Sequence, residues 1–119
     1  MNRSYLTIAE TADMLGVARQ TVRRRVYSGL LPSLWLGPRL IRVEARCIVQ
    51  DAPPPVQSWP AAIGVGDLAS AWRLHPRTIH ALAGAGLIPG HRVHGQWAFR
   101  PRELAELVRR LTTGSREAA

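Results

Sequence analysis

Residues 7–32 read TIAETADMLGVARQTVRRRVYSGLLP, and this stretch decides the fold of the chain. Thr7 followed three residues later by Glu10 is a capping-box pattern, which predicts the start of a helix. Gly16 is the residue type that commonly ends one. A second helix is predicted from residue 19 to residue 28, just before Gly29. Two short helices joined by a tight turn form a helix-turn-helix.

The two sides of the second predicted helix differ in chemistry. Val22 and Val26 are spaced i, i+4 and are predicted to pack inward. The opposite side carries residues that suit a polar, anionic partner: Arg19, Gln20, Arg23, Arg24 and Tyr27. Arg25 lies beside the apolar side, where a guanidinium needs a partner, and Glu10 or Asp13 is predicted to supply it.

A basic hairpin is predicted after these two helices. Residues 34–36 and 39–43 favour two short strands joined by a turn at Gly37 and Pro38, and a third helix is predicted to start near Glu44. A helix-turn-helix followed by such a hairpin is a winged helix-turn-helix, whose second helix fits the major groove of DNA.

The chain then repeats itself. Residues 29–32 (GLLP) recur as residues 86–89 (GLIP), 57 positions later, within an ordered series of matching positions. The second copy predicts helices over residues 65–73 and from His75 onward, a hairpin over residues 91–99, and a last helix over residues 101–111. The predicted fold is therefore mainly α with small β-hairpin wings, arranged as two tandem winged helix-turn-helix units.

The repeat sets the expected domain boundaries, which are a first unit at 1–49, a Pro-rich linker at 50–60, a second unit at 61–111 and a flexible tail at 112–119. Pro53, Pro54 and Pro55 predict an extended linker. About ten such residues span roughly 30 Å, close to the separation of about 34 Å between successive major grooves. One chain could thus occupy two neighbouring grooves and recognise a direct repeat. An ordinary flexible spacer is the alternative.

The charge of the chain favours a nucleic-acid partner. The 119 residues hold 16 basic side chains, all Arg, and 8 acidic ones, which gives a net charge of +8. Residues 1–58 and 59–119 each contain 8 Arg and 4 acids, so both units are basic. An isoelectric point near 11.5 is typical of a nucleic-acid-binding domain.

Other classes of protein are disfavoured by what the sequence lacks. A single Cys, Cys47, excludes an internal disulfide framework and is predicted to be buried. Trp35, Trp72 and Trp97 are predicted to pack in the core or on the hairpins, with stacking on bases as the alternative. No signal peptide or membrane span is evident, which predicts a soluble, cytoplasmic, nucleoid-associated protein. No catalytic constellation, metal-ligand set or cofactor motif is found, so the chain is predicted not to be an enzyme.

The segments YLTIAETADMLGVARQTVRR (residues 5–24) and GLLP (residues 29–32) resemble the excisionase/MerR-type winged helix. The resemblance is strong over residues 5–49 and looser over 61–111, and the tandem arrangement departs from most small excisionases. It implies DNA binding with the second helix in the major groove and the wing on the backbone. Members of the family bend attachment-site DNA and steer an integrase, or regulate transcription, and some phage terminase small subunits carry similar domains.

The predicted DNA contacts are unequal between the two units. They are Arg19, Gln20, Thr21, Arg23, Arg24, Arg39 and Arg42 in the first unit, and Arg77, Thr78, His80, Arg92, Gln96 and Arg100 in the second. Arg23 and Arg24 correspond to His80 and Ala81. We therefore expect the first unit to supply most of the base recognition and the second to add backbone affinity.

The sequence thus predicts a sequence-specific double-stranded DNA-binding protein, an excisionase-like directionality factor or a small transcription regulator of a mobile element. Cooperative self-association on DNA is compatible with this function. The alternative is an interaction module in which only the first unit binds DNA. The second unit would then mediate dimerisation or recruit an integrase, a polymerase or a terminase.

Overall fold

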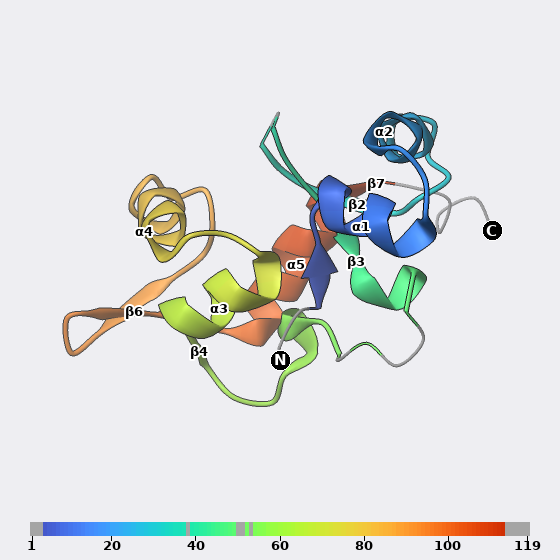
Figure 1. Ribbon diagram of the computed structural model, residues 1–119. Coiled ribbons are helices and arrows are strands. Elements are labelled where there is room, and N and C mark those ends of the chain that lie inside the picture. The colour runs from blue at the N-terminus through green and yellow to red at the C-terminus, as the bar shows by residue number, and fades with distance from the viewer. Residues whose placement is uncertain (1–3, 38, 50–51, 53, 114–119) are drawn as a thin grey trace.

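The computed structural model describes residues 4–37, 39–49, 52 and 54–113 (Figure 1). The first half, residues 4–49, contains β1 (Tyr5–Leu6), α1 (Ile8–Leu15), α2 (Arg19–Tyr27), β2 (Ser33–Gly37), β3 (Leu40–Glu44) and the 3-10 turn η1 (Ala45–Cys47). The second half, residues 54–113, contains the 3-10 turn η2 (Val56–Ser58), β4 (Ile63–Gly64), α3 (Val65–Trp72), α4 (Pro76–Gly84), β5 (His91–Val93), β6 (Gln96–Phe99), α5 (Pro101–Leu111) and β7 (Thr112–Thr113). Each half thus carries a strand, two helices and a hairpin in the same order.

The two helices of the first half begin and end where the sequence predicts. The Thr7 hydroxyl accepts a hydrogen bond from the Glu10 backbone N–H at 3.1 Å, and the Glu10 carboxylate accepts one from the Thr7 N–H at 2.9 Å. Gly16 ends α1 with a left-handed φ of 68°. The helix predicted near Glu44 is wrong, because only the short turn η1 forms there. The chain continues into Ile48 and Val49, which are β-branched residues of low helix propensity.

The strands form two antiparallel sheets with the orders β1-β3-β2-β7 and β4-β6-β5. In the first sheet, β7 pairs with β2, so that Leu34 lies opposite Thr112 and Ser33 opposite Thr113. The end of the second half therefore joins the sheet of the first half. The predicted flexible tail at 112–119 is wrong for Thr112 and Thr113, and residues 114–119 lie outside the described part of the chain.

The β2–β3 hairpin is covered on both faces. On one face Ile41 and Val43 belong to a small core with Ala12, Val22 and Val26, and Trp35 packs against it. On the other face Leu34 belongs to a larger core, and Leu36 packs against that core. Because successive strand residues point to opposite faces, the apolar run 34–36 supplies both cores.

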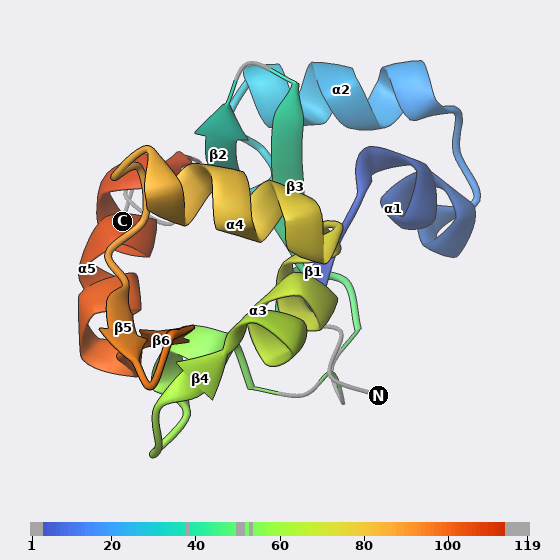
Figure 2. The ribbon, with the colours of Figure 1, turned by 90° about the vertical axis from the view of Figure 1, so that its left-hand side faces the viewer.

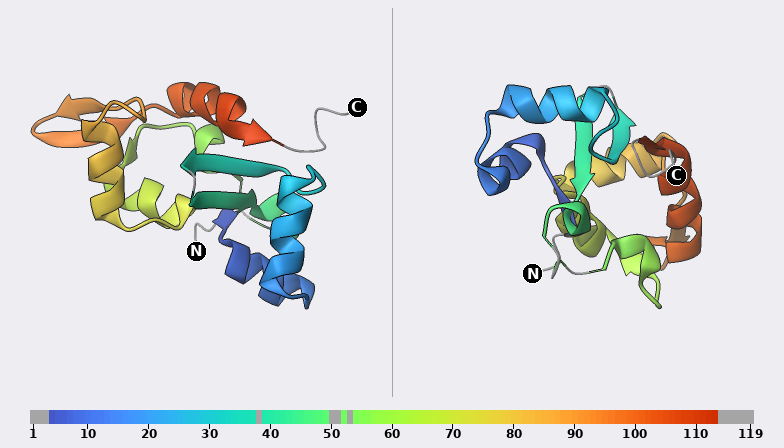
Figure 3. Two further views of the ribbon diagram at one scale, coloured as in Figure 1. Left: turned by 90° about the horizontal axis from the view of Figure 1, so that it is seen from above. Right: turned by 90° about the vertical axis from the view of Figure 1, so that its right-hand side faces the viewer.

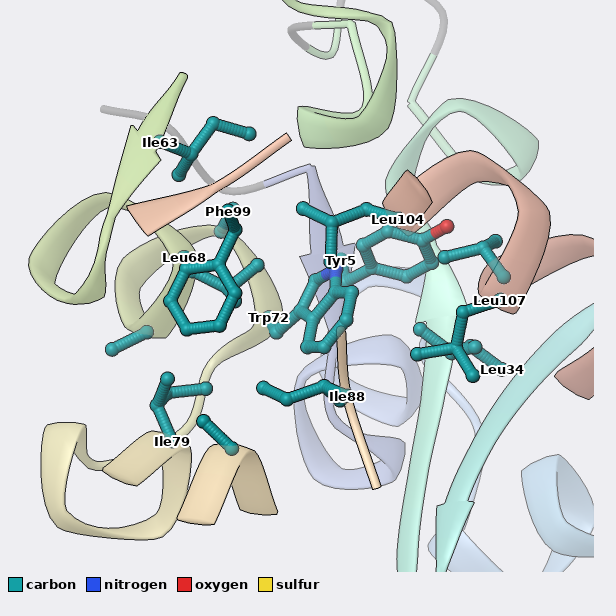
Figure 4. Close-up of a cluster of buried hydrophobic side chains, with 14 residues drawn as sticks. Tyr5, Leu34, Ile63, Leu68, Trp72, Ile79, Ile88, Phe99, Leu104 and Leu107 are labelled. Carbon is teal, nitrogen blue, oxygen red and sulfur yellow. The ribbon is translucent and has the colours of Figure 1, made fainter. Parts of the chain in front are cut away.

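The larger core joins the two halves (Figure 4). Trp72 of α3 is fully buried at its centre, as the sequence predicts, and Phe99, Leu68 and Leu104 of the second half surround it. Tyr5 and Leu34 enter the same cluster from the first half, at 2% and 1% exposure. The two halves are thus packed against each other through side chains that each half alone would expose to water.

The segment between the halves is folded onto the protein. Residues 56–58 form η2, which packs beside α5. The Gln57 amide donates to the Tyr5 hydroxyl at 3.0 Å, and the Trp59 indole N–H donates to the Pro54 carbonyl at 3.3 Å. The predicted extended linker is therefore wrong over residues 54–60, because these contacts and the packing of Trp59 hold it against the core. Residues 50, 51 and 53 lie outside the described residues.

Candidate nucleic-acid interface

The outer face of α2 is cationic and open to solvent. Val22 and Val26 are buried beneath the helix and fix its orientation. Their burial turns the predicted contact residues Arg19, Gln20, Arg23 and Arg24 outward, and all four are exposed. Thr21, also predicted to contact DNA, is half-buried. Together with Tyr27, three of the exposed residues (Gln20, Arg23 and Arg24) line a shallow surface groove of about 300 Å³.

The C-terminal end of α2 is tied to the wing. The rings of Tyr27 and Trp35 lie 5.5 Å apart at 59°, a tilted aromatic contact. Tyr27 nevertheless keeps 64% of its surface exposed. At the other end of the helix, Ala18 provides no side-chain cap, and the positive end of the helix dipole lies there. At the hairpin turn, Arg39, which is predicted to contact the DNA backbone, is exposed.

The corresponding face of α4 carries fewer charges. Arg77 and His80 are exposed, whereas Thr78 is half-buried. The N-terminus of this helix is capped by its own chain, since His75 Nδ1 accepts a hydrogen bond from the Arg77 N–H at 3.0 Å. The exposed surface toward its C-terminal end is made of Ala81, Gly84 and Ala85.

The second hairpin supplies the other predicted contacts. The Arg92 guanidinium lies 5.0 Å from the centre of the Trp97 ring and donates to the Gly95 carbonyl at 3.2 Å. This cation–π contact holds the charge on the hairpin surface. Gln96 and Arg100, two of the predicted DNA contacts, are exposed. Gln96 and His80 line the same groove, of about 430 Å³, so the hairpin and α4 present one continuous surface.

Arg42 does not belong to this surface. It lies opposite Leu34 in the hairpin, on the face that the second half covers. Its guanidinium donates to the carbonyls of Trp72 at 2.8 Å and Arg73 at 2.9 Å, at the C-terminal end of α3. Burial lowers the pKa of Arg42 from its ordinary value, while the charge of Glu10 opposes this effect. This side chain, for which the sequence predicts a phosphate contact, joins the two halves in the structure.

A second contact between the halves involves a residue that the sequence did not single out. Arg73 has a left-handed φ of 56° at the end of α3. Its Nη2 lies 2.7 Å and its Nε 3.0 Å from Glu10 Oε2, and this hydrogen bonding raises the Arg73 pKa. Glu10 was one of two acids, with Asp13, predicted to pair with Arg25, and the structure pairs it with Arg73. Arg25 itself is half-buried.

The signal for this interface was present in the hairpin sequence. Leu34 and Leu36 alternate with Trp35, so both faces of one strand are apolar, as in strands that are covered on both sides. Arg42 lies on the same face as Leu34 and had to be covered with it. Cys47, in contrast to the prediction, is exposed.

The described residues contain no group of three or more His, Cys, Asp or Glu side chains that could hold a metal ion. No helix in the described ranges is long and apolar enough to cross a membrane.

Comparison with known proteins agrees with the exposed cationic helix. The helix-turn-helix domain family matches residues 5–50. An excisionase of Mycobacterium phage D29 is 58% identical over 38 residues, which are 32% of this chain and 68% of that protein. The chain belongs to the excisionase-type helix-turn-helix family of DNA-binding proteins. No solved structure gives a significant match.

Excisionase-type membership identifies a DNA-binding protein rather than an enzyme. The family match ends at residue 50, at the close of the first half. It therefore covers α1, α2 and the β2–β3 hairpin, which carry the exposed cationic face. The second half, with its sparser charges, lies outside the matched residues.

Proposed function

We propose that this chain is a recombination directionality factor that binds double-stranded DNA in a sequence-dependent manner. α2 would enter the major groove, and Arg39 at the hairpin turn would contact the phosphate backbone. The observation that carries the proposal is the outward face of α2, on which Arg19, Arg23 and Arg24 are exposed in a row. Arginine forms bidentate contacts with guanine edges and phosphates.

The second half is proposed to act as a second winged helix-turn-helix unit that adds backbone affinity. It has the same order of strand, helices and hairpin as the first half. Arg77, His80, Arg92, Gln96 and Arg100 are exposed on it, which supports contact with phosphates. Because α4 carries fewer charged side chains than α2, we assign most base recognition to α2.

The task within recombination is inferred from the relative named as an excisionase. Such a factor would bind beside an attachment site and act with an integrase. Cooperative self-association on DNA would strengthen its binding to the site. A small regulator of transcription would use the same surface. The second candidate function is recruitment of a partner protein or dimerisation by the second half. The exposed small side chains Ala81 and Ala85 beside Gly84 favour it, because they permit close helix packing.

The test is selection of fragmented genomic DNA by the purified protein at physiological salt, followed by sequencing of the retained fragments. Enrichment of a motif beside an attachment site supports the directionality role, and enrichment beside promoters would reassign the task to transcription. Enrichment of one short sub-site would make the second half a partner-binding module. If no sequence is enriched, specific DNA binding is ruled out and the search moves to proteins.

A further inference from the structure

The two helices proposed to face DNA are held on one side of the molecule. In Figure 1, α2 lies above α1 and α4 lies above α3, and the β2–β3 hairpin stands between α2 and α4. The view from above shows the same order, with the hairpin between the two helices (Figure 3, left). The β2–β3 hairpin, which contributes to the cores of both halves, therefore lies between the candidate binding surfaces of α2 and α4.

The two helices also run in the same direction. In Figure 2, α2 and α4 lie lengthwise, and the colour of each changes toward the C-terminus from right to left. The halves are thus arranged head to tail. Proteins with two-fold symmetry bind palindromic sites. Units arranged head to tail instead match two sub-sites that repeat in the same direction.

The arrangement is fixed by several independent contacts. Tyr5 and Leu34 are buried in the core of the second half, and β7 pairs with β2. Arg42 donates to two carbonyls at the end of α3. Arg73 and Glu10 add an ion pair at 2.7 Å. Since these contacts lie on different elements, they resist rotation as well as separation of the halves.

We propose that α2 and α4 form one rigid, head-to-tail pair that binds a direct repeat with a single fixed spacing, and that Arg42 is one of the residues that hold this spacing. The inference rests on the proposed function, and it names the form of the DNA site. The longest dimension of the molecule is 45 Å, which exceeds the length of one helical turn of DNA, about 34 Å. A flexible tandem would accept several spacings, and this structure would accept one.

The rigidity can be tested without DNA. Ser28 and Ala85 are exposed residues that follow α2 and α4 at equivalent positions. In a Cys47→Ser background, Ser28→Cys and Ala85→Cys carry spin labels for pulsed electron resonance. We expect one narrow distance distribution in the whole protein. A broad or multiple distribution would overturn the rigid pair.

The spacing is tested by selection from a pool of random duplexes. The full chain is expected to enrich two similar sub-sites in the same direction at one spacing. Arg42→Ala is expected to keep each sub-site but widen the range of spacings, together with the label distance. Arg42→Met, which keeps the aliphatic stem but cannot donate to either carbonyl, should give the same widening. Circular dichroism and thermal melting would show that the variants are folded.

Arg46→Ala is the matched control. It removes the same charge from an exposed residue, whose guanidinium donates to the Ala52 carbonyl at 3.4 Å. It should leave both the spacing and the label distance unchanged. A narrow label distance combined with a variable spacing between the sub-sites would overturn binding at one fixed spacing. Enrichment of a single sub-site would overturn it too. A narrow distance with no enriched sequence overturns the proposed function, and the paired recognition with it.

Discussion

Arg23 is the residue whose loss should be felt most in sequence recognition. It is exposed in the middle of the outward face of α2, beside the groove formed with Gln20 and Tyr27. Arg23→Ala is expected to weaken binding to the preferred sequence by about 1–3 kcal/mol, as for a lost bidentate base contact. Fluorescence anisotropy with the selected duplex measures the change.

Arg77 provides the comparison within the same molecule, because it is exposed near the start of α4. Arg77→Ala should cost less specific affinity than Arg23→Ala and should weaken binding to unrelated sequences in proportion. An equal loss of specificity for the two variants would show that the two helices share base recognition evenly.

Arg39 is predicted to act on the backbone rather than on bases. Arg39→Ala removes one phosphate contact, which should lower the salt dependence of binding by about one unit in the slope of log K against log salt. Preferred and random sequences should weaken alike. A slope that does not change would remove Arg39 from the interface.

For single residues, the sequence predicted the exposed cationic face of α2 better than the residues that connect the two halves. Exposure of Arg19, Arg23 and Arg24 follows from the spacing of Val22 and Val26, since a helical period fixes the opposite face. The role of Arg42 could not follow from the hairpin treated as an exposed wing, because the second half covers it. Arg73 pairs with Glu10 from a left-handed backbone conformation at the end of α3. Neither a helical nor a strand periodicity in the sequence predicts that conformation.

The end of α4 carries two glycines, Gly84 and Gly86, whose replacement by Ala should change the stability of the protein in opposite directions. Gly84 is the last residue of α4, is exposed, and has open space where a Cβ would be added. Gly84→Ala should stabilise the fold by roughly 0.5 kcal/mol, because it restricts the unfolded chain at a helical position. Chemical denaturation measures the change in free energy of unfolding.

Gly86 is the matched control, since its added Cβ would also meet open space but its φ is +75°. Gly86→Ala is expected to destabilise by about 1 kcal/mol or more, because an L side chain is strained in that conformation. If both variants shift stability in the same direction, the assignment of the helix end between them is wrong.

The elements that the sequence predicted have strong local signals. Caps, glycines and apolar periods mark α1, α2, α3, α4 and α5, and glycine turns mark both hairpins. The two-residue strands β1, β4 and β7 were missed because they have no period of their own and depend on partners distant in sequence. The helix expected after β3 was wrong for a local reason, the β-branched residues that follow it.

For the whole molecule, the repeat predicted the order of elements but not how the copies pack. Internal similarity indicates two similar folding patterns and says nothing of the surface between them. That surface is built from Tyr5, Leu34 and Arg42, residues that each copy would otherwise expose or pair within itself. The Pro-rich segment was interpreted as a spacer because its composition favours extension, while Gln57 and Trp59 bind it to the core.

The shared core predicts that the two halves unfold together. Leu34 is 1% exposed and comes from the first half, yet its side chain is buried with residues of the second half. Leu34→Ala should destabilise the protein by about 2–5 kcal/mol, the range for a buried leucine. Hydrogen exchange should then rise in α2 and in α4 to a similar extent, because both halves lose the same support. Leu30→Ala, at a residue 66% exposed, is the control and should change stability by no more than about 0.5 kcal/mol. Exchange that rises in the first half alone would mean that the halves fold independently, and the packed interface would then contribute little to the fold.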